Sequence, residues 1–531
     1  MRAARGVGRA LGLGAAAWLG LVAAGSSLRG ATKPVARHDI PYSTEVATPH
    51  VPWANTLPGG PIRGFFVPPV TEGRDMVELM QRLSLEPTTV TIDRNWDVNC
   101  WGIGDYYDGD HVLRGDKDDF RIVYGYVEEE LESAKAFEVL VIPGLNGWSR
   151  YTRKTRDAIL RRVSEGAGLV LLHPFVGDVK GHPFLGDEAS GDERIWEISP
   201  LVGVPDDRVS DRGYPELNRE AITEGQWRAR PHPITEGLDL DRVPSGARGG
   251  RFYRYQAKGD VAVEAAGLPV VATRTYGKGR VVAFAAVGDG LIPDAIDPVK
   301  TRTYWDYWEY QYSLVARAVL WAARGESAVR LPNLAASAES GLTLVLASPA
   351  VRTVEVEARA RSENGSVLGT ATRTLTLPNG ERPLTIASSD LAPRGWAGGR
   401  SVVDVIVRDS GTGTTLQWGW AGLEAPKSAS LSDLRPNATV YREGDTMSLV
   451  TRAAGELAGL SVRVRFGDDL GRLRAVEEAP ARGERTFFHR LDHVLGKRVT
   501  VTAELLDGKG RVGSWPSQRS ATASSRKRST R

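Results

Sequence analysis

The sequence contains very little cysteine, because Cys100 is the only one among 531 residues. No disulfide can therefore form within one chain, and the domains must depend on the packing of their cores. A thiol mechanism would need Cys100, which lies in Asn99-Cys100-Trp101-Gly102. That stretch is typical of a loop and has no strand leading into a tight turn, so we interpret Cys100 as a tolerated small residue.

An excess of charge of one sign is also lacking: 68 basic residues stand against 65 acidic ones, for a formal net charge of +3. This balance gives no reason to expect a nucleic-acid partner. Apolar residues at 41% and charged residues at 25% are ordinary for a globular protein. At about 150 residues per domain, the length predicts three or four domains.

Long hydrophobic runs are confined to the N-terminus. Three arginines precede a charge-free run, 10–25, which ends in small residues. The pattern predicts a signal peptide over 1–31 and an exported protein, periplasmic, at the cell surface or extracellular. An uncleaved anchor is the alternative, although the run is shorter than the roughly 20 residues of a membrane span. Nothing later in the chain is predicted to span a membrane, because the apolar stretch 314–323 is short and contains Arg317.

A strand-helix-strand pattern characterises residues 59–330, after a Pro- and Thr-rich linker at 32–58. Its clearest unit has a strand at 139–142, a helix at 152–165 and a strand at 169–172. The other expected elements are strands 62–68, 88–92, 270–276 and 280–285 and helices 74–83, 120–134 and 304–324. Strands that alternate with helices predict an α/β domain with a doubly wound, flavodoxin-like parallel sheet.

Beyond residue 330 the helical periodicity stops, and short alternating strands with turn signals follow. The stretch 402–418 resembles 499–515, which indicates two copies of one module. We expect two immunoglobulin-like β-sandwiches. Their expected boundaries are 331–425 and 426–520, with a disordered basic tail at 521–531.

Five segments of the α/β region occur in an order known from one superfamily. They are Val141–Gly144, Glu165–His173, His232–Leu238, Tyr276–Val282 and Trp308–Ala323. Together they resemble the class I glutamine amidotransferase-like superfamily, in particular the branch with trehalose-utilisation-like proteins and the middle domain of some β-galactosidases. The resemblance covers about residues 60–325.

The resemblance also predicts which activity is missing. Amidotransferases of this fold place a cysteine at the strand-to-helix elbow and a His-x-Glu pair later in the chain. Here the elbow reads Leu172-His173-Pro174, and no His-x-Glu follows it. The resemblance therefore implies the fold and the position of a site, without glutamine hydrolysis.

His173 is the first candidate for catalysis, since it ends a strand beside the loop that contains Gly144 and Asn146. The resemblance places the backbone amides of that loop in an oxyanion-binding region. His173 could act as a general acid or base with Asp178 or Glu309. The alternative is a histidine that hydrogen-bonds a loop carbonyl and shapes the turn.

Aromatic side chains supply the candidates for ligand binding. The stretch 304–312 has too many aromatic residues for one buried face, so Trp305 and Trp308 could stack on sugar rings. Trp148, at the end of the loop 144–148, is a further predicted ligand contact. Helix-to-sheet packing at an interdomain interface is the alternative. Together with Gly144 and Asn146, these tryptophans complete the predicted ligand-binding set.

No metal or cofactor is expected. Acidic residues and His182 follow Asp178, but their spacing matches no recognised metal site. Gly277-Lys278-Gly279 joins two strands and predicts a hairpin turn rather than a phosphate loop. His232 precedes a proline and is interpreted as structural.

The sequence thus favours an exported, catalytically degenerate amidotransferase-like protein that binds or assembles in a carbohydrate-related setting. A carbohydrate is the expected ligand class. The alternatives are a hydrolase that uses His173 with a carboxylate, and a purely structural envelope protein. Nothing in the sequence indicates the oligomeric state.

Overall fold

The computed structural model describes the greater part of three folded regions. The described residues are 50–67, 74–90, 127–133, 136–142, 148, 151–172, 174, 194–203, 220–221, 227–242, 251–252, 255–285, 309–362, 365, 367–396, 398–426, 429–438, 440–442, 444–468, 473–492, 498–507, 510–514 and 519–524.

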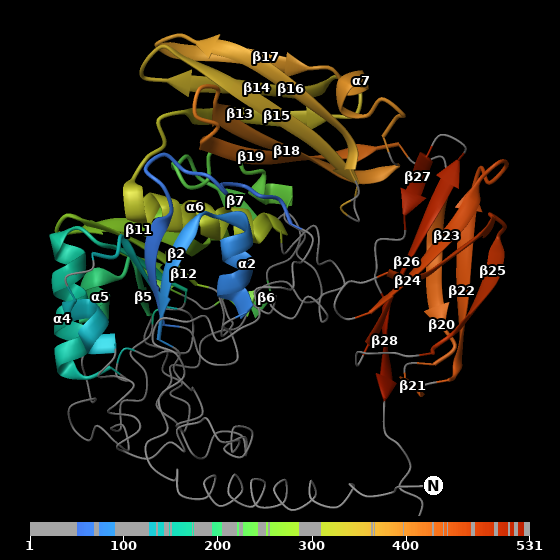
Figure 1. Cartoon of the computed structure of the whole chain (residues 1–531), viewed down its shortest axis with the longest axis horizontal. Coiled ribbons are helices and arrows are strands. Elements are labelled where there is room, and N and C mark those ends of the chain that lie inside the picture. The colour runs from blue at the N-terminus through green and yellow to red at the C-terminus, as the bar shows by residue number, and fades with distance from the viewer. Residues whose placement is uncertain are drawn as a thin grey trace, which may run out of the picture.

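The N-terminal region is built on an eight-stranded sheet in the order β2-β1-β3-β4-β12-β11-β10-β7 (Figure 1). Its strands are β1 (Ile62–Phe66), β2 (Leu85–Thr89), β3 (Val139–Ile142), β4 (Gly168–Leu171), β7 (Trp227–Ala229), β10 (Asp260–Ala265), β11 (Leu268–Tyr276) and β12 (Gly279–Phe284). The five strands from β2 to β12 are parallel, whereas β11, β10 and β7 are antiparallel. The sheet is therefore mixed, which corrects the prediction of a parallel sheet.

The antiparallel extension begins at the predicted glycine hairpin. Gly277 has a φ of 59°, in the left-handed region that favours glycine, and it turns β11 into β12. The short edge strand at the opposite end, β2, carries Pro87 in its middle, where a proline blocks further pairing. Among the described strands, the sheet continues past β12 through β11, β10 and β7.

Helices cover both faces of this sheet. They are α2 (Arg74–Arg82), α4 (Arg153–Glu165), α5 (Ile195–Ile198) and α6 (Tyr310–Arg324), and residues 127–132 are also helical. Gly168 faces α6, because a Cβ there would lie 2.4 Å from the Ala322 carbonyl oxygen. Gly279 faces α4, because a Cβ at this position would lie 2.2 Å from the Val163 carbonyl oxygen. Since Val281 pairs with Leu169, Gly279 and Gly168 lie on opposite faces.

A first all-β region, which we call sandwich 1, follows α6. It has a three-stranded sheet, β13-β14-β17, and a four-stranded sheet, β16-β15-β18-β19. The bounds are β13 (Arg330–Ser337), β14 (Gly341–Ser348), β15 (Arg352–Ser362), β16 (Val367–Leu377), β17 (Gly380–Ile386), α7 (Ser388–Leu391), β18 (Gly399–Asp409) and β19 (Thr415–Ala425). Buried side chains of both sheets, such as Leu344 and Val356, form its core.

A second all-β region, sandwich 2, has a separate core. Its sheets have the orders β20-β22-β25 and β21-β28-β26-β23-β24, and β27 pairs with β26. The bounds are β20 (Ala429–Pro436), β21 (Val440–Arg442), β22 (Thr446–Gly455), β23 (Ser461–Asp468), β24 (Leu473–Pro480), β25 (Glu484–Arg490), β26 (Arg498–Asp507), β27 (Gly510–Ser514) and β28 (Arg519–Ser524). Residues such as Phe466 and Leu449 fill the space between the sheets.

Two additions to the α/β core were not predicted. Trp418 and Trp420 of β19 belong to the same hydrophobic cluster as the α/β sheet. So do Trp53 and Leu57, which are 0% and 4% exposed. Residues 51–58, which we call the N-terminal strap, are therefore part of the folded domain, which corrects the predicted linker over these residues, while 32–49 lie outside the described residues.

No helix within the described ranges is long and apolar enough to cross a membrane.

Candidate functional site: the α6 interface and the buried Glu309 cluster

Two of the eight predicted site residues, Trp148 and Glu309, lie within the described ranges. The other six lie outside them: Gly144, Asn146, His173, Asp178, Trp305 and Trp308. Strand β3 precedes Gly144 and Asn146, and β4 precedes His173 and Asp178. The two strands are buried and parallel. The carboxyl ends of these strands therefore lie at the same edge of the sheet.

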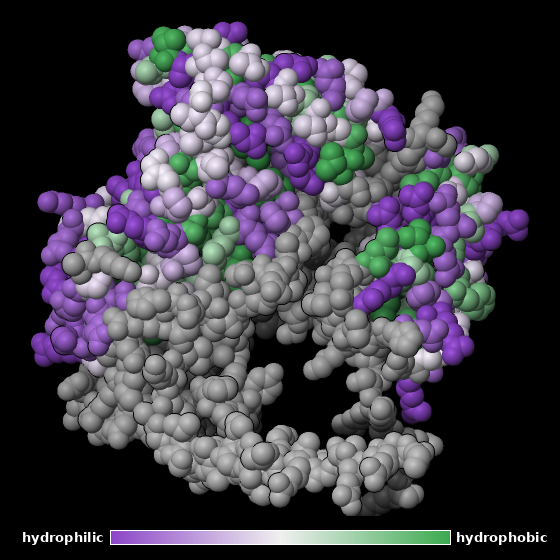
Figure 2. All heavy atoms as spheres, in the orientation of Figure 1, coloured by the Kyte–Doolittle hydropathy of each residue, from purple (hydrophilic) through white to green (hydrophobic). Residues whose placement is uncertain are grey.

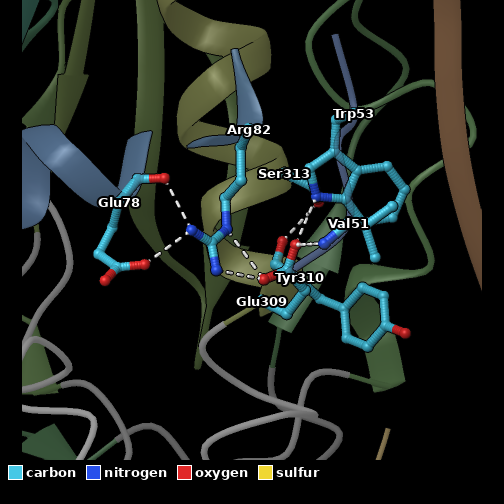
Figure 3. Close-up of polar contacts among 7 residues, drawn as sticks. All are labelled: Val51, Trp53, Glu78, Arg82, Glu309, Tyr310 and Ser313. Atoms are coloured by element: carbon cyan, nitrogen blue, oxygen red, sulfur yellow. Dashed lines mark hydrogen bonds and ion pairs between the residues drawn. The ribbon is translucent and has the colours of Figure 1, made fainter. Parts of the chain in front are cut away.

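Glu309 is enclosed by the protein, with an exposed fraction of 0% (Figure 3). Its Oε1 accepts hydrogen bonds from the Val51 backbone N at 2.8 Å and from Trp53 Nε1 at 3.0 Å. Its Oε2 accepts from Arg82 Nε at 2.9 Å and Nη2 at 2.6 Å. Both carboxylate oxygens are therefore committed to neighbours inside the fold.

Arg82 extends this cluster to a second carboxylate. Its Nη1 donates to the Glu78 carbonyl oxygen at 2.7 Å and to Glu78 Oε2 at 3.0 Å. The guanidinium also lies 4.7 Å from the centre of the Tyr312 ring. Burial alone would lower the pKa of Arg82, but Glu309 and Glu78 outweigh it and raise the pKa. The arginine is thus held as a buried cation between two acidic side chains.

This geometry does not fit the predicted catalytic role of Glu309. A general acid or base needs contact with substrate or solvent, whereas Glu309 anchors the N-terminal strap to α6 and α2. The partner residues are far apart in sequence, since Val51 and Glu309 are separated by 258 positions. No local motif links them, which is why the sequence pattern gave no signal for this cluster.

Trp148 is 1% exposed and packs edge-on against Tyr151, with ring centroids 6.5 Å apart. Its indole nitrogen has no hydrogen-bond partner among the described residues. A buried ring cannot offer a stacking face to a sugar from solvent. The placement therefore gives Trp148 a packing role at the start of α4 in place of the predicted ligand contact.

Helix α6 is buried on all sides over residues 310–319, which explains part of the aromatic cluster. Its buried residues are Tyr310, Gln311, Tyr312, Ser313, Leu314, Val315, Ala316, Arg317, Ala318, Val319 and Ala322. One side packs on the sheet and the other on β19, where the rings of Tyr310 and Trp420 have centroids 4.6 Å apart. The described aromatic residues of α6 therefore pack between the α/β sheet and sandwich 1, which was the alternative to sugar stacking.

Arg317 joins α6 to sandwich 1 at the centre of this interface. Its guanidinium donates to the carbonyl oxygens of Pro233 at 3.1 Å, Glu236 at 3.2 Å and Trp418. It also lies 4.5 Å from the centre of the Trp418 ring. Burial lowers the pKa of Arg317 to about 9. The side chain is therefore still a cation at neutral pH and holds three segments together.

A second polar contact crosses the interface at Asp404 of β18. Its Oδ1 accepts from the Tyr310 hydroxyl at 3.0 Å, and its Oδ2 accepts from Arg361 Nε at 2.5 Å. Burial raises the pKa of Asp404 to about 6, against the lowering effect of Arg361 and Tyr310. The protonation of this carboxyl group is therefore sensitive to mildly acidic conditions.

The N-terminal strap also contacts sandwich 1. The Thr415 backbone N donates to the Thr56 carbonyl oxygen at 2.8 Å. Nearby, the Trp420 backbone N donates to the Gly237 oxygen at 2.8 Å. A Cβ on Gly419 would lie 2.4 Å from that same oxygen. Only a residue without a side chain allows so close an approach of the two backbones.

The structural interpretation of His232 is confirmed. Its Nδ1 accepts from the Ile234 backbone N at 3.2 Å, and its Nε2 lies 3.0 Å from the Thr273 hydroxyl. The ring packs edge-on against Trp321. Burial lowers the pKa of His232, which favours the neutral ring that this bonding requires.

Within the described ranges, no group of three or more His, Cys, Asp and Glu residues could hold a metal ion. Asp178 and His182, with the acidic residues that follow, lie outside those ranges.

The comparisons with known proteins give no family. No protein-family model matches the sequence, and no curated protein matches it. Among solved structures, the chain is similar to the cytoplasmic proteins STM3548 of Salmonella typhimurium (16% identity, 36% of this chain, 77% of that chain, TM-score 0.24) and STM1381 of Salmonella typhimurium LT2 (15%, 48%, 99%, 0.29). It is also similar to a bacterial ice-binding adhesin (15%, 38%, 65%, 0.15). These likenesses are too weak to carry an argument about function.

Proposed function

We propose that this chain is an exported, catalytically degenerate amidotransferase-like protein with a binding or assembly role in a carbohydrate-related setting. Its α/β sheet would be flavodoxin-like and its two sandwiches immunoglobulin-like. The five motifs of the resemblance and the missing elbow cysteine support this. So does the strand order β2-β1-β3-β4-β12, which matches the 2-1-3-4-5 order of flavodoxin-like sheets.

The observation that carries the proposal is the continuous core between the α/β sheet and sandwich 1. Interdomain surfaces within one chain are usually polar enough to allow relative motion. Here Trp418, Trp420, Val402 and Ile406 complete the hydrophobic core of the α/β region. A sandwich fixed in this way suits a protein that holds a binding domain in a set orientation.

The proposed ligand site is the edge of the sheet where the parallel strands end. In open α/β sheets, ligands bind at the carboxyl ends of the strands, where the strand order reverses. That reversal falls between β1 and β3. Gly144 and Asn146 follow β3, and His173 follows β4. A sugar there would have polar groups from these loops and aromatic faces from Trp305 and Trp308, which precede α6 in the sequence.

The test is thermal unfolding of the full chain with a panel of oligosaccharides, amino acids and divalent ions. A ligand at 100 times its dissociation constant adds about 2.7 kcal/mol to the free energy of unfolding. We expect one sugar class to raise the melting temperature of the wild type but not of His173→Ala. Glu309→Gln is the matched control, because it should lower the starting stability and leave the ligand-induced shift unchanged.

Three results would contradict the proposal. The absence of any shift in the wild type would favour a purely structural protein. An equal ligand-induced shift of the melting temperature in His173→Ala would mean that the ligand binds elsewhere than at the strand ends. Release of a hydrolysis product, lost in His173→Ala, would replace binding with a hydrolase that uses this histidine.

A further inference from the structure

Apolar residues lie among hydrophilic ones over both sandwiches on the face that Figure 2 shows. Isolated apolar side chains of this kind are ordinary on protein surfaces. The contact that bears on the proposed ligand site is instead buried in the α/β region, where Tyr255 reaches the residue that follows His173.

Tyr255 donates a hydrogen bond from its hydroxyl group to the Pro174 carbonyl oxygen at 2.6 Å. The two residues are 81 positions apart in the sequence, and Tyr255 is 2% exposed. It is the first residue of β9 (Tyr255–Ala257), whose other two residues are exposed. A buried tyrosine hydroxyl group usually needs a hydrogen-bond partner. The bond therefore fixes the end of this side chain and the carbonyl group that it reaches.

Tyr255 is held by the sheets around it. Strand β9 pairs with β5 (Leu201–Gly203) in a small antiparallel sheet. Two residues beyond β9, a Cβ on Gly259 would lie 2.1 Å from the Thr273 carbonyl oxygen of β11. Strand β10 begins at Asp260 and pairs with β11. The tyrosine thus extends from regular structure, which holds a side chain more precisely than a loop does.

The Pro174 carbonyl group belongs to the elbow, Leu172-His173-Pro174, which follows β4. The Leu172 backbone N donates to the Ile142 oxygen at 3.1 Å. Pro174 is buried, and a proline disfavours the helical conformation for the residue before it. The fold therefore holds the residues on both sides of His173 in the sequence: Leu172 through β3, and Pro174 through Tyr255.

A backbone held in advance strengthens binding. If the elbow were loose, the ligand would have to order it, and part of the binding free energy would be lost. A shift of about 1 Å in a contacting group can weaken the interaction as much as a hundredfold. A contact that served stability alone would have no such effect on a dissociation constant.

We propose that Tyr255 is a positioning residue of the ligand site, because its hydroxyl group fixes the Pro174 backbone and thereby the placement of His173 at the carboxyl end of β4. This inference rests on the function proposed above, since it assigns Tyr255 to the same site. Tyr255 acts through the chain at Pro174 and does not contact the ligand itself.

The first test needs no ligand. Tyr255→Phe removes the hydroxyl group and keeps the ring that fills the core. Tyr310→Phe is the matched control, because it also removes a buried hydroxyl group, which donates to Asp404 at 3.0 Å. Hydrogen exchange in segment 169–178 of the full chain should be about fivefold faster in Tyr255→Phe, the factor expected for one net hydrogen bond. It should not change in Tyr310→Phe.

The second test measures dissociation constants by calorimetry with each oligosaccharide that raises the melting temperature of the wild type. We expect the dissociation constant of Tyr255→Phe to be at least about tenfold higher than that of the wild type. Tyr310→Phe should bind like the wild type. In a His173→Ala background, Tyr255→Phe should cause no further loss, because the tyrosine acts through the elbow.

A measurement on the wild type decides the matter if circular dichroism shows that Tyr255→Phe is unfolded. A contact that favours binding must itself be favoured by the bound oligosaccharide, to the same extent. Saturation with that oligosaccharide should therefore slow hydrogen exchange in segment 255–257 as well as in 169–172. Slower exchange in 169–172 alone would overturn the proposal.

Three other outcomes would also overturn it, and they are distinguishable. Unchanged exchange of segment 169–178 in Tyr255→Phe would show that the contact does not hold the elbow. Faster exchange with a wild-type dissociation constant would remove the positioning role and leave the proposed function intact. If no oligosaccharide stabilised the wild type, the proposed function would fail, and the positioning role with it.

Discussion

Replacement of Glu309 tests whether the buried cluster anchors the N-terminal strap. In Glu309→Ala, Arg82 would lose its buried ion pair with Glu309 and keep the one with Glu78, and loss of one member of a buried pair costs about 3 to 5 kcal/mol. The Val51 backbone N and Trp53 Nε1 would also lose their acceptor, at roughly 1 to 3 kcal/mol each. Typical domain stabilities are about 5 to 15 kcal/mol, so this variant should unfold at least part of the α/β region.

Glu309→Gln is the milder form of the same change. Its amide oxygen can still accept from Val51 and Trp53, but the charge that balances Arg82 is gone. We expect a loss of about 3 kcal/mol, near the low end for a broken buried pair. Glu264→Gln is the control, because the Arg230–Glu264 pair is partly exposed and should contribute less than about 1 kcal/mol.

Hydrogen exchange followed by mass spectrometry can locate the effect, since it reports the stability of each segment in a chain of several domains. Exchange in segments 51–57 and 310–324 should accelerate in Glu309→Gln, while segment 461–468 of sandwich 2 should not change. Unaltered exchange in 51–57 would refute the reasoning, because the strap would then be held without the carboxylate.

Three further predictions concern the α6 interface and α4. Asp404 has a folded-state pKa of about 6, above its ordinary 3.8, so its contribution to stability is greatest below pH 4 and falls as the pH rises toward 6. The free energy of unfolding should decrease by at most about 3 kcal/mol between about pH 4 and 6, as followed by thermal unfolding. Asp404→Asn should remove this pH dependence. Thr152→Ala removes the side-chain cap of α4 and should cost about 1 kcal/mol in chemical denaturation. Gly419→Ala would force a Cβ against the Gly237 oxygen and should cost roughly 1 to 3 kcal/mol, whereas Gly483→Ala, with nothing within 4 Å, should be tolerated.

Each of these predictions has an opposing result. An identical pH profile for wild type and Asp404→Asn would show that another group titrates. Unchanged stability of Thr152→Ala would mean that Glu128, which also bonds the Thr152 and Thr155 hydroxyls, holds the start of α4 without the cap. Equal melting temperatures for the two glycine variants would show that the backbones near Gly419 can separate without loss.

Local patterns in the sequence predicted several elements of the α/β region, but the strand expected at 88–92 is Leu85–Thr89, and β7, β10 and α5 were not predicted. The strand Val139–Ile142 and the helix that ends at Glu165 occur where periodicity and the following Gly166 place them. The turn at Gly277 also forms the expected hairpin. These features depend on residues that are neighbours in sequence, so hydrophobic spacing and glycine conformation are enough to define them.

The sequence by itself determined the class of each region: strands and helices up to Arg324, and strands with one short helix, α7, in the described residues thereafter. Only the tertiary structure decided that the strap is core, that α6 is buried on both sides and that Glu309 bonds Val51 and Arg82. The physical reason is that burial depends on partners hundreds of residues away, and a charged side chain has the same sequence signature on a surface as in a buried pair. The partners of Glu309 are distant in sequence, so the sequence predicted a catalytic role for a residue that anchors the N-terminal strap.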